Sequence, residues 1–168
     1  MLLVRLRVPP VKLLVLISVI RLPEGSPMRN DKVLSGSCMC GAVRYEAEGP
    51  LRPIIACHCT ECRKSTGNYF TASSAYRSNF RLLEDKGLKW YQSGTETERG
   101  FCRECGSSLF FRRIGGDRIS FSGGTIDGAS NLELAGHIFA DEKGDYYSLD
   151  NEAVVHQKDA PALIEIPE

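Results

Sequence analysis

The stretch Cys57-His58-Cys59-Thr60-Glu61-Cys62 places three of the chain's seven cysteines within six residues. The other four form an upstream pair, Cys38 and Cys40, and a downstream pair, Cys102 and Cys105. Thiolates spaced this closely suit zinc, which binds cysteine sulfur at about 2.3 Å in tetrahedral sites. A disulfide framework is less favoured, because the count is odd and the cysteines of a Cys-x-Cys pair rarely bond to each other. The clusters therefore predict metal binding in a reducing compartment, the cytoplasm.

Seven ligands divide naturally into one closed site of four and one open site of three, and two assignments fit the spacing. In the first, Cys59 and Cys62 join the downstream pair in a zinc ribbon, and Cys57 and the upstream pair are the three remaining cysteines. In the second, the upstream and downstream pairs combine, and Cys57, Cys59 and Cys62 form a compact three-ligand site. We favour the second, because three ligands within six residues can close around one metal at little cost in loop entropy. An open fourth position is typical of catalytic zinc sites.

Length and charge limit the class of protein. A chain of 168 residues is long enough for one domain with a core, but not for two full domains. Lysine plus arginine equals aspartate plus glutamate at 21 each, and no extended basic patch is visible. This balance argues against a nucleic-acid partner and gives no indication of binding to an anionic membrane surface.

Short apolar runs separated by turns predict a mainly β protein. Val43, Tyr45 and Ala47 alternate with charged residues, which is typical of a half-buried strand. Sixteen glycines and frequent turn residues favour a small fold of packed sheets. The polar segment 63–67 reads as a turn. The expected strands cover 43–47, 54–56, 69–76, 80–83, 88–91, 95–101, 108–113, 117–121, 137–140 and 146–149.

The sequence suggests three parts with different composition. Residues 1–27 combine basic residues with a short apolar run, which resembles a signal peptide but lacks a clear cleavage site. This run is too short to span a bilayer. We expect residues 1–27 to be an N-terminal extension upstream of a start at Met28, residues 28–157 to be the zinc-binding domain, and residues 158–168 to be a loosely attached tail.

Five segments together resemble one known family, the glutathione-dependent formaldehyde-activating enzymes, which also include centromere protein V. They are Gly36-Ser37-Cys38-Met39-Cys40-Gly41, Cys57-His58-Cys59-Thr60-Glu61-Cys62-Arg63-Lys64, Phe101-Cys102-Arg103-Glu104-Cys105-Gly106, the stretch from Asp117-Arg118-Ile119 through Gly124-Thr125-Ile126-Asp127, and His137-Ile138-Phe139. The resemblance covers roughly Met28 to His156. The three cysteine clusters in this order are its most specific feature.

The resemblance implies an Mss4-like fold, mainly β, with small packed antiparallel sheets and zinc knuckles. It implies two zinc ions per chain. The structural zinc would be held by Cys38, Cys40, Cys102 and Cys105, and the catalytic zinc by Cys57, Cys59 and Cys62. The implied reaction is the reversible addition of formaldehyde to glutathione, a carbon–sulfur lyase activity whose partners are a small thiol and an aldehyde.

The chemistry of a three-thiolate zinc fits a thiol substrate. Three thiolates leave a net charge of about −1 on such a centre, which makes it less suited to generating hydroxide than to holding a soft sulfur ligand. We hypothesise that the substrate thiol takes the fourth position and that its sulfur attacks the aldehyde carbon. Arg63 and Lys64 follow the cluster in sequence and would offset its negative charge.

Two alternatives stay open at the level of sequence. The cluster at Cys57 could hold a second structural zinc, with His58 or the distant His137 as its fourth ligand. The whole chain could also be a non-catalytic zinc module that binds a protein partner, because fold does not fix function. The open site separates the two classes, since an adaptor does not need a three-coordinate zinc and a lyase does.

Overall fold

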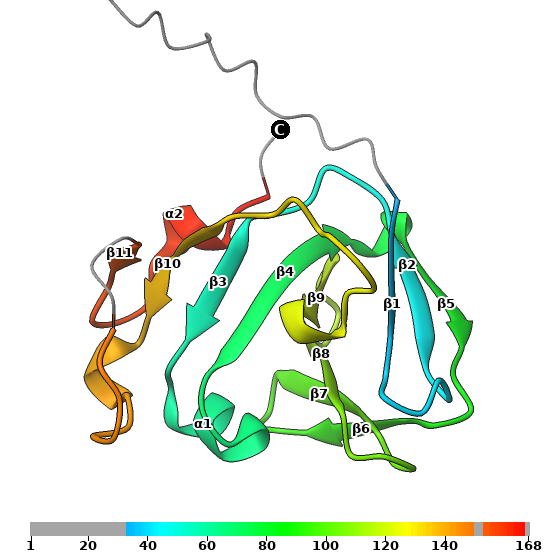
Figure 1. Ribbon diagram of the computed structural model, residues 1–168, viewed down its shortest axis with the longest axis horizontal. Coiled ribbons are helices and arrows are strands. Elements are labelled where there is room, and N and C mark those ends of the chain that lie inside the picture. Colours follow the sequence, from blue (N-terminus) through cyan, green and yellow to red (C-terminus); the bar gives the residue numbers. More distant parts are fainter. Residues whose placement is uncertain (1–32, 150–152, 167–168) are drawn as a thin grey trace, which may run out of the picture.

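Two β-sheets make up the body of the protein in the computed structural model, which describes residues 33–149 and 153–166 (Figure 1). The small sheet has the strand order β1-β2-β5, and the large sheet has the order β11-β10-β3-β4-β9-β8-β7-β6. All pairs of neighbouring strands are antiparallel except β3 with β10 and β10 with β11.

The described strands are short, and helices are few. The strands are β1 (Leu34–Ser37), β2 (Arg44–Ala47), β3 (Ile54–Cys57), β4 (Phe70–Tyr76), β5 (Phe80–Glu84), β6 (Leu88–Gln92), β7 (Thr97–Cys102), β8 (Ser108–Arg113), β9 (Arg118–Ser122), β10 (Leu134–Ile138) and β11 (Val154–Val155). The α-helices are α1 (Thr60–Thr66) and α2 (Pro161–Ile164), and the 3-10 turns are η1 (Arg77–Asn79), η2 (Gly123–Thr125) and η3 (Ala140–Glu142). Among the described helices, none is long and apolar enough to cross a membrane.

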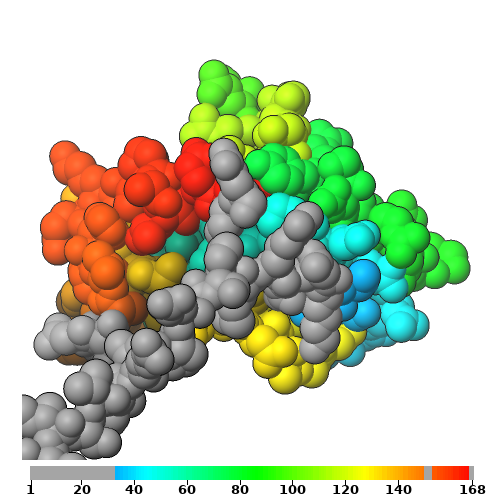
Figure 2. All heavy atoms as spheres, turned by 90° about the horizontal axis from the view of Figure 1, so that it is seen from above, coloured from blue at the N-terminus to red at the C-terminus, as the bar shows by residue number. Residues whose placement is uncertain are grey.

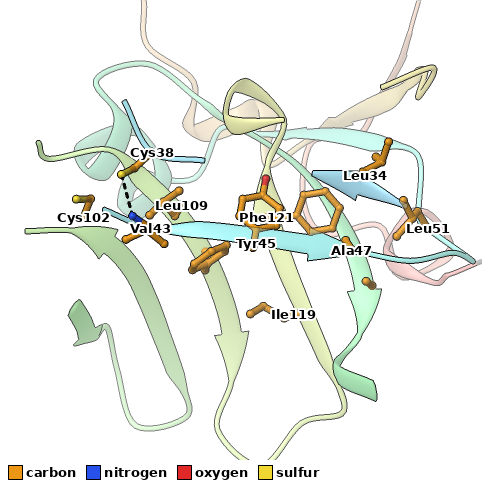
Figure 3. Close-up of a cluster of buried hydrophobic side chains, with 12 residues drawn as sticks. Leu34, Cys38, Val43, Tyr45, Ala47, Leu51, Cys102, Leu109, Ile119 and Phe121 are labelled. Atoms are coloured by element: carbon orange, nitrogen blue, oxygen red, sulfur yellow. Dashed lines mark hydrogen bonds between the residues drawn. The ribbon is translucent and has the colours of Figure 1, made fainter. Parts of the chain in front are cut away.

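The main core lies between the small sheet and one face of the large sheet (Figure 3). Tyr45 of β2 is fully buried at its centre, and its ring packs edge-on against Phe110 of β8 at 5.2 Å between centroids. Phe121 of β9 is also fully buried and lies 5.6 Å from the Tyr45 ring. Cys38 and Cys102 belong to the same core, so the upstream and downstream cysteine pairs sit where the two sheets meet.

The opposite face of the large sheet is covered by the C-terminal segment. Because successive side chains of a strand point to opposite faces, Phe111 and Ser120 point away from the core that holds Phe110 and Phe121. Figure 2 shows residues 153–166, in orange and red, packed against the body of the protein. Ala160 is buried there, and the N–H of Phe139 donates to the carbonyl of Lys158 at 3.1 Å.

The predicted mainly β fold class is confirmed, but the large sheet is mixed rather than purely antiparallel, and several local expectations differ from the structure. Segment 63–67, expected to be a turn, lies almost wholly in helix α1, because the Cys59-x-x-Cys62 turn continues for a further turn. Segment 146–149 is not a strand, because Tyr146 lies in a turn and Tyr147 packs against His58 rather than along the sheet. The C-terminal segment was expected to be a loosely attached tail, but its described part packs against the protein as far as Ile166, which is buried. The expected extension at residues 1–27 lies outside the described residues, and the domain boundaries stay predictions.

Candidate metal centres and the adjoining cavity

The upstream and downstream cysteine pairs come together in one cluster. The four sulfur atoms of Cys38, Cys40, Cys102 and Cys105 all lie within 4.8 Å of one another. Cys40 Sγ lies 3.6 Å from Cys38 Sγ and 3.7 Å from Cys102 Sγ. A tetrahedral zinc with Zn–S bonds of about 2.3 Å requires S–S edges of about 3.8 Å, so this cluster has the dimensions of a four-cysteine zinc site.

Two tight turns aim these sulfurs at one point. Each turn ends on a glycine with positive φ, Gly41 at 76° and Gly106 at 78°, a conformation that glycine adopts without strain. The N–H of Gly106 donates to the carbonyl of Cys102 at 2.8 Å, which closes the downstream turn. The N–H of Val43 donates to Cys38 Sγ at 3.2 Å (Figure 3), the kind of bond that stabilises a thiolate ligand.

The remaining three cysteines form a second cluster at the end of β3. Cys57 is the last residue of β3, Cys59 precedes α1, and Cys62 is buried in the first turn of that helix. Their sulfur atoms lie within 4.8 Å of one another. Among residues 33–149 and 153–166, no fourth histidine, cysteine or carboxylate lies within that distance of all three. The structure thus groups the seven cysteines as four and three, in the second of the two assignments.

Helix α1 fixes the geometry of the three-cysteine cluster. The N–H of Arg63 donates to the carbonyl of Cys59 at 2.9 Å, which is the first helical bond and brings Cys59 and Cys62 to the same side. The Thr66 hydroxyl donates to the Cys62 carbonyl at 2.8 Å. The helix ends at Gly67, whose φ of 84° is the left-handed conformation common at helix C-termini.

The donor set fits a divalent cation. Hydrogen bonds from the Cys57 and Cys62 thiols lower the pKa of Cys59 well below its usual range. The same contact with Cys59, followed by that with Cys62, raises the pKa of Cys57 far above its usual range. Three adjacent thiolates repel one another, so ionisation of all three requires a cation such as Zn²⁺ between them.

The three-cysteine cluster lines one end of a cavity of about 280 Å³. Phe70 and Ala72 of β4 and Phe111 of β8 supply apolar walls, and Arg99 of β7 supplies a charged one. Ile138 of β10 closes the side next to Cys57, its partner in the strand register. The sulfurs therefore face a space that a small molecule can enter, whereas no cysteine of the four-cysteine cluster lines this cavity, and Cys38 and Cys102 are buried in the main core.

Arg99, not Arg63 or Lys64, is the cationic group at the three-cysteine cluster. Its Nη1 lies 3.7 Å from Cys62 Sγ, and its Nη2 donates to Glu61 at 2.9 Å. Only 14% of its side chain is exposed, and it packs over the Phe111 ring at 5.3 Å. Arg63 and Lys64 lie in the last turn of α1, and neither is among the described residues that line the cavity. The sequence alone does not single out Arg99, because its place at the cluster depends on the pairing of β7 with β8, where it lies opposite Phe111.

His58 points away from the cluster, and its ring belongs to a buried chain of hydrogen-bonded polar groups. Its ring is fully buried, with Nδ1 at 2.7 Å from the Tyr147 hydroxyl and Nε2 at 2.9 Å from His137 Nδ1. Burial lowers the pKa of His58 to about 4, with smaller contributions from the charges of His137 and Lys143. A neutral His58 ring with both nitrogens occupied cannot also bind a metal in this arrangement. His137 Nε2 has no hydrogen-bond partner among the described residues, but neither histidine has a ring nitrogen within 4.8 Å of all three sulfurs, so neither completes the three-cysteine site.

The sequence is similar to those of several known proteins. The sequence pattern of the glutathione-dependent formaldehyde-activating enzyme family matches residues 33–142, about two thirds of the chain. An uncharacterized lyase of Schizosaccharomyces pombe is 28% identical over 117 residues, which cover 69% of this chain and 85% of the relative. A putative glutathione-dependent formaldehyde-activating enzyme of Halomonas elongata is 33% identical over 86 residues, 46% of this chain and 55% of the relative.

A crystal structure of a Rhodobacter sphaeroides protein is also similar to this chain, at 28% sequence identity. The match covers 58% of this chain and 91% of that one, with a TM-score of 0.47. The segment that matches the family's sequence pattern, residues 33–142, contains all seven cysteines of the two clusters. Because the family's sequence pattern matches residues 33–142, about two thirds of the chain, the chain belongs to the glutathione-dependent formaldehyde-activating enzyme family.

Proposed function

We propose that the protein is a zinc-dependent carbon–sulfur lyase that adds an aldehyde such as formaldehyde to a thiol such as glutathione. The observation that carries this proposal is the three-cysteine cluster, which faces a cavity and has no fourth protein ligand among the described residues. The names of the relatives, a lyase and a putative glutathione-dependent formaldehyde-activating enzyme, support the same class of reaction.

Each of the two clusters would hold one zinc ion. Cys38, Cys40, Cys102 and Cys105 would hold a structural zinc, and Cys57, Cys59 and Cys62 a catalytic one. When bound at the three-cysteine cluster, zinc would supply a Lewis-acidic position that keeps a substrate sulfur as thiolate at neutral pH. In the overall reaction a carbon–sulfur bond forms between the thiol and the carbonyl carbon, and the thiol proton ends on the former carbonyl oxygen.

The residues around the cluster support this chemistry in two ways. Arg99 lies against Cys62 and would offset the negative charge of three thiolates and a substrate thiolate. Phe70 and Phe111 exclude water from the walls of the cavity, which strengthens the interaction of Arg99 with anionic groups. His58, which is neutral and fully bonded, holds the turn between Cys57 and Cys59 in place rather than reaching the substrate.

The first test is metal content together with activity in wild type and in Cys59→Ser. We expect two zinc ions per chain in wild type and one in Cys59→Ser, with an unchanged circular dichroism spectrum. Wild type should accelerate formation of the S-hydroxymethyl hemithioacetal from glutathione and ¹³C-formaldehyde. The rate is measured by NMR exchange spectroscopy. Cys59→Ser should lose that acceleration.

Two results would overturn the proposal. One is a wild type that holds only one zinc, or a Cys59→Ser variant that unfolds, which would make the cluster structural and favour a protein-binding zinc module. The other is an X-ray absorption spectrum in which the zinc coordination of the wild type does not change on adding glutathione.

A further inference from the structure

A second and larger cavity adjoins the one at the three-cysteine cluster. It has a volume of about 420 Å³, against about 280 Å³ for the first. The two cavities share six lining residues, so they lie side by side between the large sheet and the C-terminal segment, and we refer to the pair as the groove. The shared residues are Arg52, Phe111, Arg113, Ser120, Asp159 and Ile164.

Five arginines line this groove, and three of them are already paired. Arg99 bonds to Glu61, Arg112 to Glu98 at 2.7 Å, and Arg118 to Glu165 at 2.6 Å. Among the described residues, the other two, Arg52 and Arg113, have no carboxylate within ion-pair distance. These two are also the arginines that both cavities share, so the unpaired positive charge lies where the cavities meet.

Arg52 is buried to an unusual degree for an unpaired charge. Only 3% of the residue is exposed. Its Nη2 donates to the carbonyl of Ala72 at 2.8 Å, and its buried Nε has no hydrogen-bond partner among the described residues. Burial, and then the nearby charge of Arg118, lowers the pKa of Arg52 to about 10, which still leaves it protonated at neutral pH. Desolvation penalises a buried charge that has no counter-ion, so a bound anion would stabilise Arg52 in this position.

We propose that Arg52 and Arg113 bind a carboxylate of the thiol substrate, at the junction of the two cavities. This inference rests on the proposed function, since it assumes that the thiol of the same molecule lies at the three-cysteine cluster. Guanidinium groups bind carboxylates through paired, charge-assisted hydrogen bonds, and two arginines that line the same groove can bind one anion between them. The substrate is then an extended thiol compound whose carboxylate is remote from its sulfur.

Asp159 sets a limit on the shape of this ligand. Its carboxylate accepts the N–H of Ala160 at 2.9 Å and lines both cavities. It would repel a second carboxylate placed near it and would attract a protonated amine. A thiol that carries both groups, such as an amino-acid or peptide thiol, fits this arrangement better than a simple mercapto acid.

The test is the affinity of the zinc-loaded protein for glutathione and for its diethyl ester, measured by calorimetry. The ester keeps the thiol and the amine but lacks both negative charges. We expect wild type to bind glutathione at least about tenfold more tightly than the ester, the effect of one charged hydrogen bond. Arg113→Gln, at an exposed position, should abolish most of that preference. Arg44→Gln, exposed on β2 outside the groove, is the matched control and should keep it.

The same measurement separates the failure of this inference from the failure of the proposed function. Equal affinity for acid and ester in wild type, or an equal preference in Arg113→Gln and Arg44→Gln, would overturn the carboxylate site while the thiol chemistry stands. S-methylglutathione keeps the carboxylates but has no free thiol, so its affinity measures binding at the carboxylate site independently of the sulfur. Its binding should weaken about tenfold in Arg113→Gln even if no turnover of glutathione is found.

Discussion

At the scale of single residues, the bond between Tyr147 and His58 offers a clear test of the buried polar chain. Tyr147→Phe removes a hydroxyl at 2.7 Å from His58 Nδ1 and leaves a buried ring nitrogen unpaired. We expect the free energy of unfolding, measured by urea denaturation of the zinc-loaded protein, to fall by about 1–3 kcal/mol. The neighbouring Tyr146→Phe is the matched control, because Tyr146 is 66% exposed and its hydroxyl reaches only the Gly67 carbonyl at 3.4 Å. Equal effects of the two variants would show that the buried chain does not stabilise the fold.

The residues of the candidate site differ in how well the sequence alone predicts them. The seven cysteines could be predicted because their spacing is itself the ligand geometry. Arg99 and Arg52 could not, since their roles depend on which strand lies beside the cluster and which side chain is left unpaired. Arg63 and Lys64 are next to Cys62 in sequence, but the helix carries them away from the cavity. Adjacency along the chain is a poor guide to adjacency in a site built from several strands.

At the scale of elements, helix α1 depends on how it ends. Gly67 has a φ of 84°, and a Cβ added there would meet no atom within 4 Å, so only the backbone conformation resists a side chain. We expect Gly67→Ala to lower the free energy of unfolding by about 1 kcal/mol. Gly124→Ala is the control, because Gly124 has no positive φ and its nearest contact would be at 3.9 Å. Thermal unfolding followed by circular dichroism measures both, and a Gly124→Ala loss as large as that of Gly67→Ala would contradict the role given to the left-handed conformation.

The elements that sequence predicts best are the strands with strong patterns. The range 108–113 matches β8, and 69–76 matches β4 to within one residue, because both are rich in aromatic and small residues. Helix α1 was missed because its seven residues are polar apart from a cysteine, and so carry no apolar periodicity. The parallel pairing of β3 with β10 was also beyond the sequence, since it joins segments about eighty residues apart.

At the scale of the whole molecule, the four-cysteine cluster joins the two sheets. Cys38 follows β1 of the small sheet, and Cys102 ends β7 of the large sheet. A zinc ion bound there would link Cys40 to Cys102 across 62 positions of the chain, whereas the three-cysteine cluster lies within six residues. The two sites therefore constrain the unfolded chain to very different extents, even though each would hold one zinc ion.

This difference predicts which zinc site stabilises the fold. The chain-entropy relation for cross-links gives about 4 kcal/mol for a loop of this length and about 2 kcal/mol for a loop of five residues. Cys40→Ser should therefore lower the thermal unfolding temperature about twice as much as Cys59→Ser, when both are measured in the same excess of zinc. Cys40→Ser should also unfold at a lower concentration of a zinc chelator, while Cys59→Ser stays folded at that concentration because its four-cysteine cluster is intact. An equal fall in the unfolding temperature of the two variants would mean that the three-cysteine cluster stabilises the fold as much as the four-cysteine cluster does. The assignment of one structural and one catalytic site would then be wrong.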